Sequence, residues 1–399
     1  MIGNKKIKIL ISAYAVRPNS GSETGVGWNY IKEISQMKKF EITVVTEIEF
    51  KKDIDHESAK LGLDINFIYI SVGNLGRRLC WNQGNWFFYF FYQLWQYRVY
   101  KCVKKIHKLK PFDVIHHLNM IGFREPGYLW KLTSTRFIIG PLGGYGVANF
   151  KILALNYPRK VIIKEFVKSF INNLQIHHSS RFKNAIRKAY SVYAAYPEMK
   201  FVISKYCNPI ILSENGADNG PVKTYLDDIN HPNNDRKYII FIGKDVPRKN
   251  LNFLIKVFEN PFFLEYDLVL LGRINRIFSN KRIKSLGFID HKQVANYLIN
   301  ADLHWFPSLH DSNATSLVES LSYGVPTLAF NKWGTSCQES ELLFKIDESE
   351  HDLYNKWANM SKKILELGIT NHTRHEKASL YRKNNSWKTL AQKISKSYE

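Results

Sequence analysis

The stretch FPSLHDSNATSLVESLSYGVPTLAF, from Phe306 to Phe330, decides the fold that we predict for this chain. It starts at the end of an apolar strand, passes through the polar turn SLHDSN and continues as a helical pattern in which apolar residues surround Glu319. A second strand-like run, VPTLAF, follows the helix directly. Because a carboxylate on a largely apolar helix needs a partner or a ligand, Glu319 is a candidate binding residue.

Similar strand-like runs, rich in β-branched residues, recur along the whole chain with helical patterns between them. They start at Ile7, Glu41, Ile65, Asp113 and Arg136 in the first half, and at Tyr238, Asp267, Ala301 and Val325 in the second. A polar segment, residues 221–236, separates the two series. The sequence therefore predicts an α/β fold with two domains, each a doubly wound parallel sheet with helices on both faces.

The length of the chain also fits two domains, because 399 residues exceed the size of one ordinary core. The predicted ranges are an N-terminal domain, a linker, a C-terminal domain and a last helix, at 1–205, 206–236, 237–383 and 384–399. Ligands of open parallel sheets bind at the carboxyl ends of the strands. We therefore expect the chemistry in the loops that lead from strands into helices.

Composition narrows the classes of partner. The chain has 57 Lys and Arg against 35 Asp and Glu, a formal net charge of +22, which indicates an anionic partner: nucleic acid, a phosphorylated substrate or an acidic membrane face. Its four cysteines match no metal-binding spacing and favour reduced thiols in the cytoplasm. The apolar runs Ile7–Val16 and Trp86–Tyr97 are too short to cross a bilayer, so we expect neither a signal peptide nor a membrane span.

A glycine-rich loop follows the first predicted strand. The sequence RPNSGSETGVGWN places Gly21, Gly25 and Gly27 at the start of a helix, whose unpaired backbone amides could bind a phosphate. The same glycines could instead serve only a tight turn. Both interpretations remain open at the level of sequence.

A basic loop follows the first strand of the second series. The sequence GKDVPRKN contains Lys244, Arg248 and Lys249 between a strand and a helix. Cations in this position could neutralise a departing diphosphate without a metal ion. The alternative is that they are merely solvated surface charges.

The order of these segments resembles a known family. GKDVPRKNLNFLI, DLVLLGRI, IKSLGFID and the stretch from ADLHWFP to VPTLAF are similar to the donor half of the family 4 (GT4), group 1 retaining glycosyltransferases. The resemblance extends upstream through GSETGVGW, DVIHHLN, IIGPLGGYG and SENGAD, and it ends with NNSWKTLAQKI. The form GPLGG resembles one branch of the family. The resemblance implies the GT-B fold, with an acceptor-binding N-terminal domain, a donor-binding C-terminal domain and a last helix that crosses back to the first domain.

The resemblance also implies a set of donor-binding residues. The family has two acidic residues eight positions apart, the first at the donor sugar and the second at the ribose, and they correspond to Asp311 and Glu319. Since Glu is usual at the first position, Asp311 is a departure that bears on the donor sugar. The basic pair at the diphosphate corresponds to Lys244 and Lys249, with Lys in place of the commoner Arg at 244. The remaining predicted donor-binding residues are Gly243, Arg248, Ser312, Asn313, Ala314, Thr315 and Ser316.

A second departure concerns a catalytic-site His. Many members of the family have it after the strand that is RFIIGPLGGYG here, where this chain has Gly143 and Gly144. His116 and His117 end the preceding strand, and at most one of them should enter the cleft, because adjacent strand residues point to opposite faces. A structural role for both is the alternative. The predicted phosphate and acceptor loops comprise Gly21, Ser22, Glu23, Gly25, Gly27, Gly143 and Gly144.

The predicted activity is transfer of a sugar from a nucleotide sugar to a glycan or a lipid-linked oligosaccharide, in the biosynthesis of a bacterial surface polysaccharide such as lipopolysaccharide. We expect no cofactor and no metal, since the DID of Asp53–Asp55, the metal signature of the other major glycosyltransferase fold, lies in a polar run. The alternatives are another GT-B enzyme, such as a nucleotide-sugar epimerase, and a basic nucleic-acid-binding protein with salt-dependent affinity.

The expected location is the cytoplasm, with peripheral contact at the anionic inner face of the cytoplasmic membrane and no nucleic acid as a partner. Two segments that mix aromatic and basic residues suit such a contact, residues 86–110 and 157–170. For the first of them, packing of the aromatic residues in the core is the alternative.

Overall fold

The computed structural model describes most of the chain, over residues 6–80, 86–120, 122–147, 149–217, 236–312 and 314–399. The chain forms two compact units. The first comprises Met1–Tyr145, Asn172–Glu214 and Trp387–Glu399, and the second comprises Gly146–Ile171 and Asn215–Ser386. The predicted domain ranges divide the chain differently, because they place Gly146–Ile171 in the N-terminal domain. Most of the predicted linker, at 218–235, lies outside the described residues.

A parallel sheet forms the centre of the first unit. In the described residues it has seven strands in the order β3-β2-β1-β4-β5-β6-β7. Their bounds are β1 (Ile7–Ala13), β2 (Phe40–Glu47), β3 (Ile65–Ile70), β4 (Val114–Asn119), β5 (Arg136–Leu142), β6 (Ser191–Ala194) and β7 (Ile210–Ile211). Ile9 pairs with Ile42 of β2 on one side and with Val114 of β4 on the other, so the strand order reverses at β1. Such a reversal is the usual ligand-binding position of an open parallel sheet.

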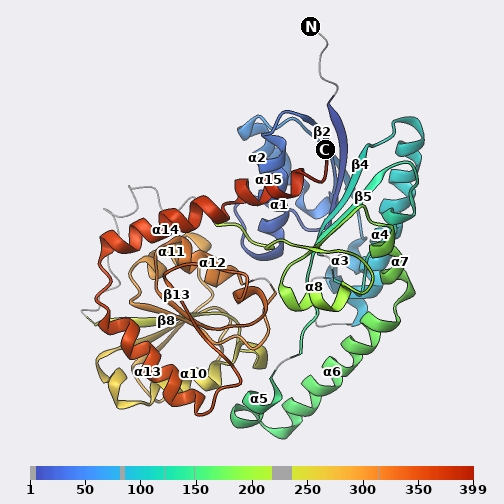
Figure 1. The fold of residues 1–399 in the computed structure, drawn as a ribbon. Helices are drawn as coiled ribbons and strands as arrows, with labels where there is room; N and C mark the ends of the chain where they lie inside the picture. Colours follow the sequence, from blue (N-terminus) through green and yellow to red (C-terminus); the bar gives the residue numbers. More distant parts are fainter. Residues whose placement is uncertain (1–5, 81–85, 121, 148, 218–235, 313) are drawn as a thin grey trace. The chain divides into compact units, whose positions relative to one another are not determined.

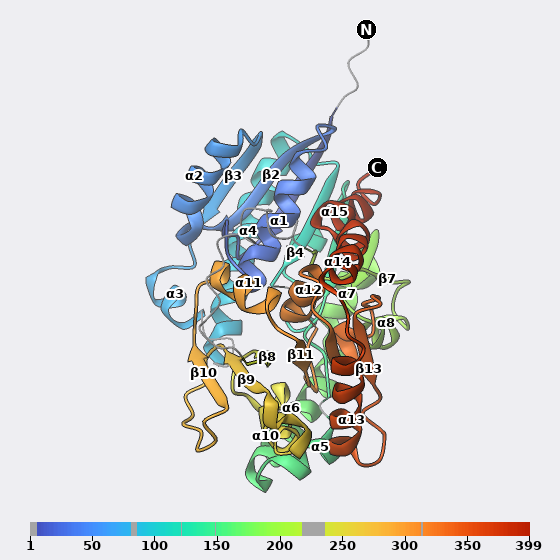
Figure 2. The same cartoon turned by 90° about the vertical axis from the view of Figure 1, so that its left-hand side faces the viewer.

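Helices surround this sheet (Figure 1). Their bounds are α1 (Ser22–Ser35), α2 (Lys51–Leu61), α3 (Asn74–Cys80), α4 (Trp86–Leu109), α7 (Ser180–Lys188), α8 (Pro197–Ile203) and α15 (Trp387–Ser395), with the short turns η1 (Ile48–Phe50) and η2 (Leu129–Lys131). A further helix, α6 (Arg159–His178), belongs to the second unit up to Ile171 and to the first from Asn172. Figure 2 shows α15 beside α1, and the rings of Tyr30 and Trp387 meet edge to face between them at 5.4 Å.

The second unit also contains a parallel sheet. Its described strands number six and follow the order β10-β9-β8-β11-β12-β13. Their bounds are β8 (Tyr238–Ile242), β9 (Asp267–Leu271), β10 (Ile283–Gly287), β11 (Leu303–Phe306), β12 (Thr327–Phe330) and β13 (Leu343–Ile346). The strand order reverses between β8 and β11, which gives the second unit its own switch point.

The helices of the second unit bury their apolar faces against this sheet and one another. Their bounds are α5 (Phe150–Asn156), α10 (Leu251–Phe258), α11 (His291–Ile299), α12 (Thr315–Ser322), α13 (Leu353–Glu366) and α14 (Asn371–Asn385), with the turns η3 (Pro247–Lys249), η4 (Pro261–Glu265) and η5 (Trp333–Thr335). Helix α10 packs on α13, where the rings of Phe253 and Trp357 meet edge to face at 5.4 Å. The Trp305 indole donates to Ser361 Oγ at 2.9 Å, so this buried polar atom is satisfied.

The predicted fold class is confirmed: both units are doubly wound parallel sheets with helices. Each predicted strand is present, whereas β6, β7, β10 and β13 are strands that the prediction does not contain. Over the ranges that the structure describes, no helix is both long enough and apolar enough to span a bilayer.

The carboxyl terminus is anchored in the first unit by buried polar contacts. Tyr398, which is fully buried, places its hydroxyl 2.7 Å from Nδ1 of His116 in β4. Arg136 donates to the Tyr398 carbonyl at 2.5 Å, and the Ser397 hydroxyl lies 2.6 Å from that of Tyr193. The last residues of the chain therefore take part in the folding of the first unit.

Replacing Tyr398 with Phe should leave the Nδ1 atom of His116 buried without a partner. We expect the free energy of unfolding to fall by about 1–3 kcal/mol, measured by urea denaturation. The matched control is Tyr190→Phe at an exposed tyrosine of the same unit, which should change stability by less than about 0.5 kcal/mol. Equal losses in the two variants would contradict the anchoring role.

Candidate functional site

The switch point of the second unit brings two loops together. The loop after β8 contains η3, and the loop after β11 leads to α12. The two loops are hydrogen-bonded to each other: the Leu309 amide donates to the Arg248 carbonyl at 2.8 Å, and the Arg248 guanidinium donates to the His310 carbonyl at 3.2 Å. The backbone of one loop therefore fixes the position of the other.

A charged cluster lies where these loops meet. Lys249 donates a hydrogen bond to the carboxylate of Asp311, and Nη1 of Arg248 lies 3.7 Å from Oδ1 of the same group. The Lys249 ammonium also lies 5.0 Å from the centre of the Phe306 ring, within the range of a cation–π contact. The structure thus brings together three of the predicted donor-site residues.

Burial and the charge of the partner shift the pKa of Asp311, and likewise that of Lys249, in opposite directions. Burial alone would raise the pKa of Asp311, but the charges of Lys249 and Arg248 lower it below its ordinary value. Burial lowers the pKa of Lys249, and Asp311 partly offsets this by raising it, while Arg248 and Lys244 lower it further. Each member of the pair therefore favours the charged form of the other.

The basic loop begins where the backbones after β8 and β9 pack closely together. Gly243 follows β8 directly, and its amide donates to the Leu271 carbonyl at 2.9 Å. Gly272, which follows β9, has φ +123°, and a Cβ atom at that position would overlap the Gly243 carbonyl. Lys244 comes next in the loop and is exposed. A glycine at 272 is thus required for the loops after β8 and β9 to approach each other.

The amino end of α12 follows Asp311 closely. Ala314 precedes the helix and provides no side-chain cap, and Thr315, the first helical residue, accepts a hydrogen bond from the Asn215 amide at 3.1 Å. Glu319 lies one turn later and is half-buried, on the same face of the helix as Thr315. The other predicted members of this segment are Ser312, half-buried, Ser316, buried, and Asn313, which lies outside the described residues.

A third loop, after β12, supports the loop of Asp311. The Trp333 indole donates to the Leu309 carbonyl at 2.7 Å, and its ring meets that of His310 edge to face at 5.0 Å. The Gly334 amide donates to the Asp311 carbonyl at 3.0 Å. Trp333 and Gly334 are absent from the predicted site, although the sequence NKWG directly follows the strand VPTLAF, and loops after strands are where the site is expected.

Two buried polar side chains beside the cluster were also missed. His304 of β11 is fully buried, and neither ring nitrogen has a hydrogen-bond partner within the part of the chain that the structure describes. Burial, with a smaller contribution from the charge of Lys249, lowers its pKa to about 3, so the ring is neutral. The Asn250 amide group is likewise buried without a partner among the described residues. Unpaired polar atoms of this kind lower the stability of the folded state.

The glycine-rich loop of the first unit serves close packing. A Cβ atom on Gly27 would lie 2.5 Å from the Ala15 carbonyl, and one on Gly25 would overlap the preceding loop. Asn119, at the end of β4, donates to the carbonyls of Ala15 and Glu23 at 2.5 and 3.3 Å. Burial raises the pKa of Glu23, against a backbone hydrogen bond from residue 120 that lowers it. The structure places the predicted residues Gly21, Ser22, Glu23, Gly25 and Gly27 at the amino end of α1.

The other predicted loop of the first unit follows β5. Gly143 pairs with Gly122 in an isolated parallel bridge, and Gly144 is half-buried beside it. The loop therefore lies next to the end of β4, at the same edge of the sheet as the glycine-rich loop.

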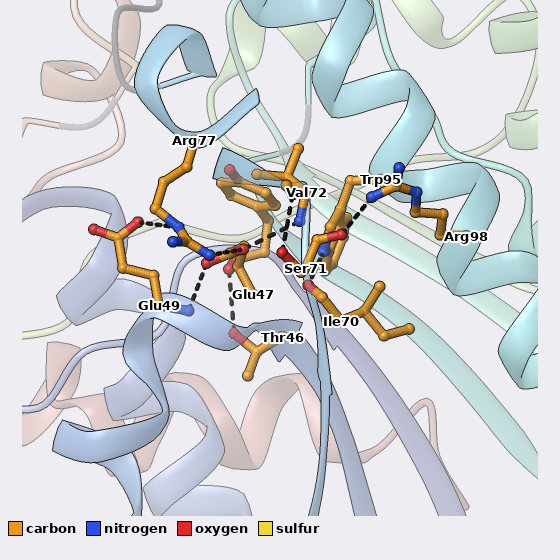
Figure 3. A network of polar contacts seen from close by, with 11 residues as sticks. Thr46, Glu47, Glu49, Ile70, Ser71, Val72, Arg77, Trp95 and Arg98 are labelled. Carbon is orange, nitrogen blue, oxygen red and sulfur yellow. Dashed lines mark hydrogen bonds and ion pairs between the residues drawn. The ribbon is translucent and has the colours of Figure 1, made fainter. Parts of the chain in front are cut away.

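Buried acidic side chains at this edge already have protein partners. Figure 3 shows Glu47, at the end of β2, accepting hydrogen bonds from the amides of Glu49 and Val72 at 2.6 and 3.1 Å, and from Arg77 at 3.2 Å. The Trp95 indole donates to a carbonyl at the end of β3 at 2.7 Å (Figure 3). Because its contacts tie the ends of β2 and β3 to α3, Glu47 organises the loops of this edge.

His116 and His117 are both buried and hydrogen-bonded. The Gly140 carbonyl lies 2.9 Å from Nε2 of His116 and can only accept, so this nitrogen carries the proton and Nδ1 accepts from Tyr398. Nδ1 of His117 donates to the Pro126 carbonyl at 3.3 Å, and Nε2 accepts from the Gln96 amide at 3.1 Å. Burial lowers the pKa of His116 to about 3 and that of His117 to about 4. This geometry supports structural roles for both rings.

The acidic residues of the DID signature are paired with cations. Asp53 lies 2.9 Å from Arg17, and Asp55 lies 2.6 Å from Lys51, both on the exposed surface of α2. Among the residues whose positions are described, no three or more His, Cys, Asp or Glu side chains form a group that could hold a metal ion.

The low pKa of His117 predicts a pH-dependent contribution to stability. Between about pH 4 and 6.5 the unfolded chain binds a proton at this residue that the folded chain excludes, so the free energy of unfolding should fall as pH falls through this window, by about 1.4 kcal/mol per pH unit. In His117→Gln, urea denaturation between these values should give a slope smaller by that amount. His56→Gln, at an exposed site, should keep the wild-type slope. An unchanged slope in His117→Gln would contradict a buried neutral ring.

This chain is similar to known proteins in part of its sequence and in its fold. The model of the family "Glycosyl transferases group 1" matches residues 223–340, which include the basic loop, Asp311 and Glu319. A comparison with curated proteins found no match. Sucrose-phosphate synthase from Thermosynechococcus elongatus has a TM-score of 0.65 and 13% identity, over 98% of this chain and 98% of that one.

Two further solved structures have the same architecture along their whole length. The catalytic domain of starch synthase IV from Arabidopsis thaliana, bound to ADP and acarbose, has a TM-score of 0.62 and 13% identity, covering 98% of each chain. The Anabaena protein HepE, in complex with UDP and glucose, has a TM-score of 0.57 and 14% identity, over 98% of this chain and 99% of that one. The chain thus has the GT-B fold, and its residues 223–340 match the group 1 glycosyl transferases.

Proposed function

We propose that this chain is a glycosyltransferase that moves a sugar from a nucleotide-sugar donor, bound by the second unit, to an acceptor hydroxyl. The observation that carries the proposal is the cluster of Lys249, Arg248 and Asp311 at the switch point of the second sheet, within the segment that matches the family. A crevice at such a switch point is where open parallel sheets bind ligands. Two proteins of similar fold hold ADP or UDP in their solved structures, which supports a nucleotide as the ligand.

The charges of the cluster suit the departure of a nucleoside diphosphate. When the bond between the sugar and the diphosphate breaks, negative charge develops on the leaving oxygen. Lys249 and Arg248 would stabilise that charge, together with Lys244 at the start of the loop and the amide dipoles at the amino end of α12. Because these groups are already in position, little rearrangement is needed when the charge forms.

The two acidic residues would have different tasks. Asp311 holds Lys249 at the diphosphate position and would direct its remaining carboxylate oxygen toward the donor sugar. Glu319, one turn into α12, would accept hydrogen bonds from the ribose hydroxyls. Both tasks follow the resemblance of the segment to family 4, and the charge cluster supports the first of them.

The finer features of the proposal concern stereochemistry, acceptor and location. Transfer would retain the configuration at the anomeric carbon and require no metal ion or other cofactor. The acceptor would be a glycan or a lipid-linked oligosaccharide of a bacterial surface polysaccharide, met on the cytoplasmic side of the membrane. The net charge of +22 supports peripheral contact with anionic lipid there.

Donor binding gives the first test. In a thermal-shift panel of nucleotide sugars, we expect at least one donor to stabilise the chain, by about 2.7 kcal/mol at a concentration of a hundred times its Kd. Lys249→Ala and Glu319→Ala should weaken that binding at least about tenfold, because each removes a charged contact. Lys363→Ala, at an exposed lysine of the same unit, is the control and should bind as the wild type does.

Product analysis separates the proposed transferase from an epimerase. Release of nucleoside diphosphate should depend on an added acceptor and persist in EDTA, whereas an epimerase would convert the donor sugar without an acceptor. The proposal fails if no nucleotide sugar stabilises the chain, or if the Lys249 and Glu319 variants bind it unchanged.

The identity of residue 311 should influence donor choice. Asp311→Glu restores the residue usual in family 4 and moves the carboxylate further from the backbone by one C–C bond, so its alignment with the sugar hydroxyls changes. We expect the ratio of kcat/KM between two donor sugars to change at least about tenfold, since a misplaced polar contact discriminates strongly. Measurement of kcat/KM for a set of donors checks this. A ratio within twofold of the wild type would remove Asp311 from the sugar contact.

A further inference from the structure

Helix α6 packs against the protein partly through polar side chains, with Ile176 as a buried apolar residue near its carboxyl end. The side that packs against the protein includes Ser169 and Asn172, both buried, and Asn172 accepts a hydrogen bond from Arg124. By contrast, α10 buries apolar side chains throughout, as amphipathic helices in a soluble domain normally do. A helix that packs partly through polar residues has apolar residues left over for its outer face.

An apolar stripe occupies that outer face. It consists of five exposed residues, each of which has another member of the set three or four positions away, namely Ile163, Phe166, Val167, Phe170 and Leu174. Ile163, Phe166 and Phe170 expose 62%, 57% and 60% of their surface. Three- and four-residue spacing places these side chains on one side of the helix, over a length of about 17 Å. Contiguous apolar surface of this kind marks an interaction site.

A row of lysines borders the stripe. Lys160, Lys164 and Lys168 are spaced four apart, all exposed, and their positions on the helix follow one edge of the apolar stripe. The acidic residue of the helix is Glu165, which lies 3.5 Å from Lys168. With Arg159, the helix has four cationic residues against one acidic residue, a net charge of 4 − 1 = +3 with His neutral.

We propose that the outer face of α6 is a docking surface for an anionic lipid bilayer. The helix would lie in the plane of the interface, with its apolar stripe among the acyl chains and its lysines extended to the lipid phosphates. Charge complementarity selects this occupant, because a second copy of the chain would bring the same large positive charge to the contact. The surface stands independently of sugar transfer, since binding to vesicles needs neither donor nor acceptor.

The other aromatic and basic segment, α4, is a weaker candidate for this role. Its residues Phe88, Tyr92 and Trp95 are buried, and Trp95 makes edge-to-face contact with Tyr14 at 4.9 Å. Phe88, Tyr92 and Trp95 therefore belong to the core of the first unit, as the alternative interpretation of that segment predicts, whereas Phe87, Phe90 and Tyr97 of α4 are exposed. The two segments have similar composition, but α4 buries three large aromatic side chains, whereas the two aromatic rings of phenylalanine in α6, Phe166 and Phe170, are both exposed.

Vesicle flotation with the full chain tests the proposal. The vesicles contain either mixed phosphatidylglycerol and phosphatidylethanolamine or phosphatidylcholine alone, at low and high salt. The wild type should float with the anionic vesicles at low salt. The double variant Phe166→Ser/Phe170→Ser should lower the partition coefficient at least about tenfold, because it removes the two largest apolar side chains of the stripe.

Vesicle binding should respond differently to replacement of the lysine row and to the control substitutions. Replacement of Lys160, Lys164 and Lys168 by Gln should lower binding roughly tenfold to a hundredfold at low salt and remove most of its salt dependence. The control Leu109→Ser/Leu367→Ser alters two exposed apolar residues elsewhere and should bind within about twofold of wild type. Circular dichroism and thermal melting establish that every variant folds.

Three results would overturn the proposal: no flotation of the wild type with anionic vesicles at low salt, an equal loss in the control, or a vesicle-free dimer that Phe166→Ser/Phe170→Ser dissociates. The last result would assign the face to contact between copies of the chain. Because nucleotide-sugar binding is measured without lipid, failure here would leave the proposed donor site untouched.

Discussion

The ion pair between Lys249 and Asp311 connects the two loops on which the candidate site depends. Both side chains are largely removed from water, so neither charge is tolerable there without the other. The pair can form only if the loops after β8 and β11 keep their relative positions. The backbone hydrogen bond from Leu309 to Arg248 holds the two loops in those positions. Loss of either charge would therefore affect the shape of the site as well as its charge.

Different kinds of side chain lie at the carboxyl ends of the strands in the two sheets. At the edge of the first sheet, the buried carboxylate of Glu47 is satisfied by amides and by Arg77, and glycines let α1 approach the loop before it. At the edge of the second sheet, cations accumulate, and His304 and Asn250 are buried without partners among the described residues. Ser12 and Asn119 of the first sheet also have buried polar atoms without partners among the described residues, so the surplus of positive charge is what distinguishes the second edge, and it favours an anionic ligand.

Much of this arrangement could be predicted from the sequence, because long β-branched runs between helical patterns determine the parallel sheets. The prediction missed β6 and β13, each of which has only four residues and lies at or near the edge of its sheet. It identified Lys249 and Asp311 through a family resemblance, since spacing alone does not reveal that residues 62 positions apart form a pair. The support from Trp333 and Gly334 is likewise a tertiary contact and has no local signature.

The burial of the two histidines also depends on tertiary contacts that the local sequence does not reveal. Strand alternation indicated that at most one of His116 and His117 should face a ligand, but alternation does not reveal what covers each face. In the structure, His116 meets Tyr398, which lies 282 positions later in the chain, and His117 meets Gln96 of α4. Their burial thus depends on the carboxyl terminus and on a helix, and both rings become part of the core.

In helices α4 and α6, distant contacts decide the burial of a whole face. Periodicity in a sequence gives the width of an apolar stripe, but the side of the helix that the protein covers depends on distant contacts. In α4 the buried side includes Phe88, Tyr92 and Trp95, whereas in α6 it includes Asn172, which accepts a hydrogen bond from Arg124. Composition alone therefore treats the two segments as equivalent, and only tertiary packing shows which apolar side chains of each helix are buried and which are exposed.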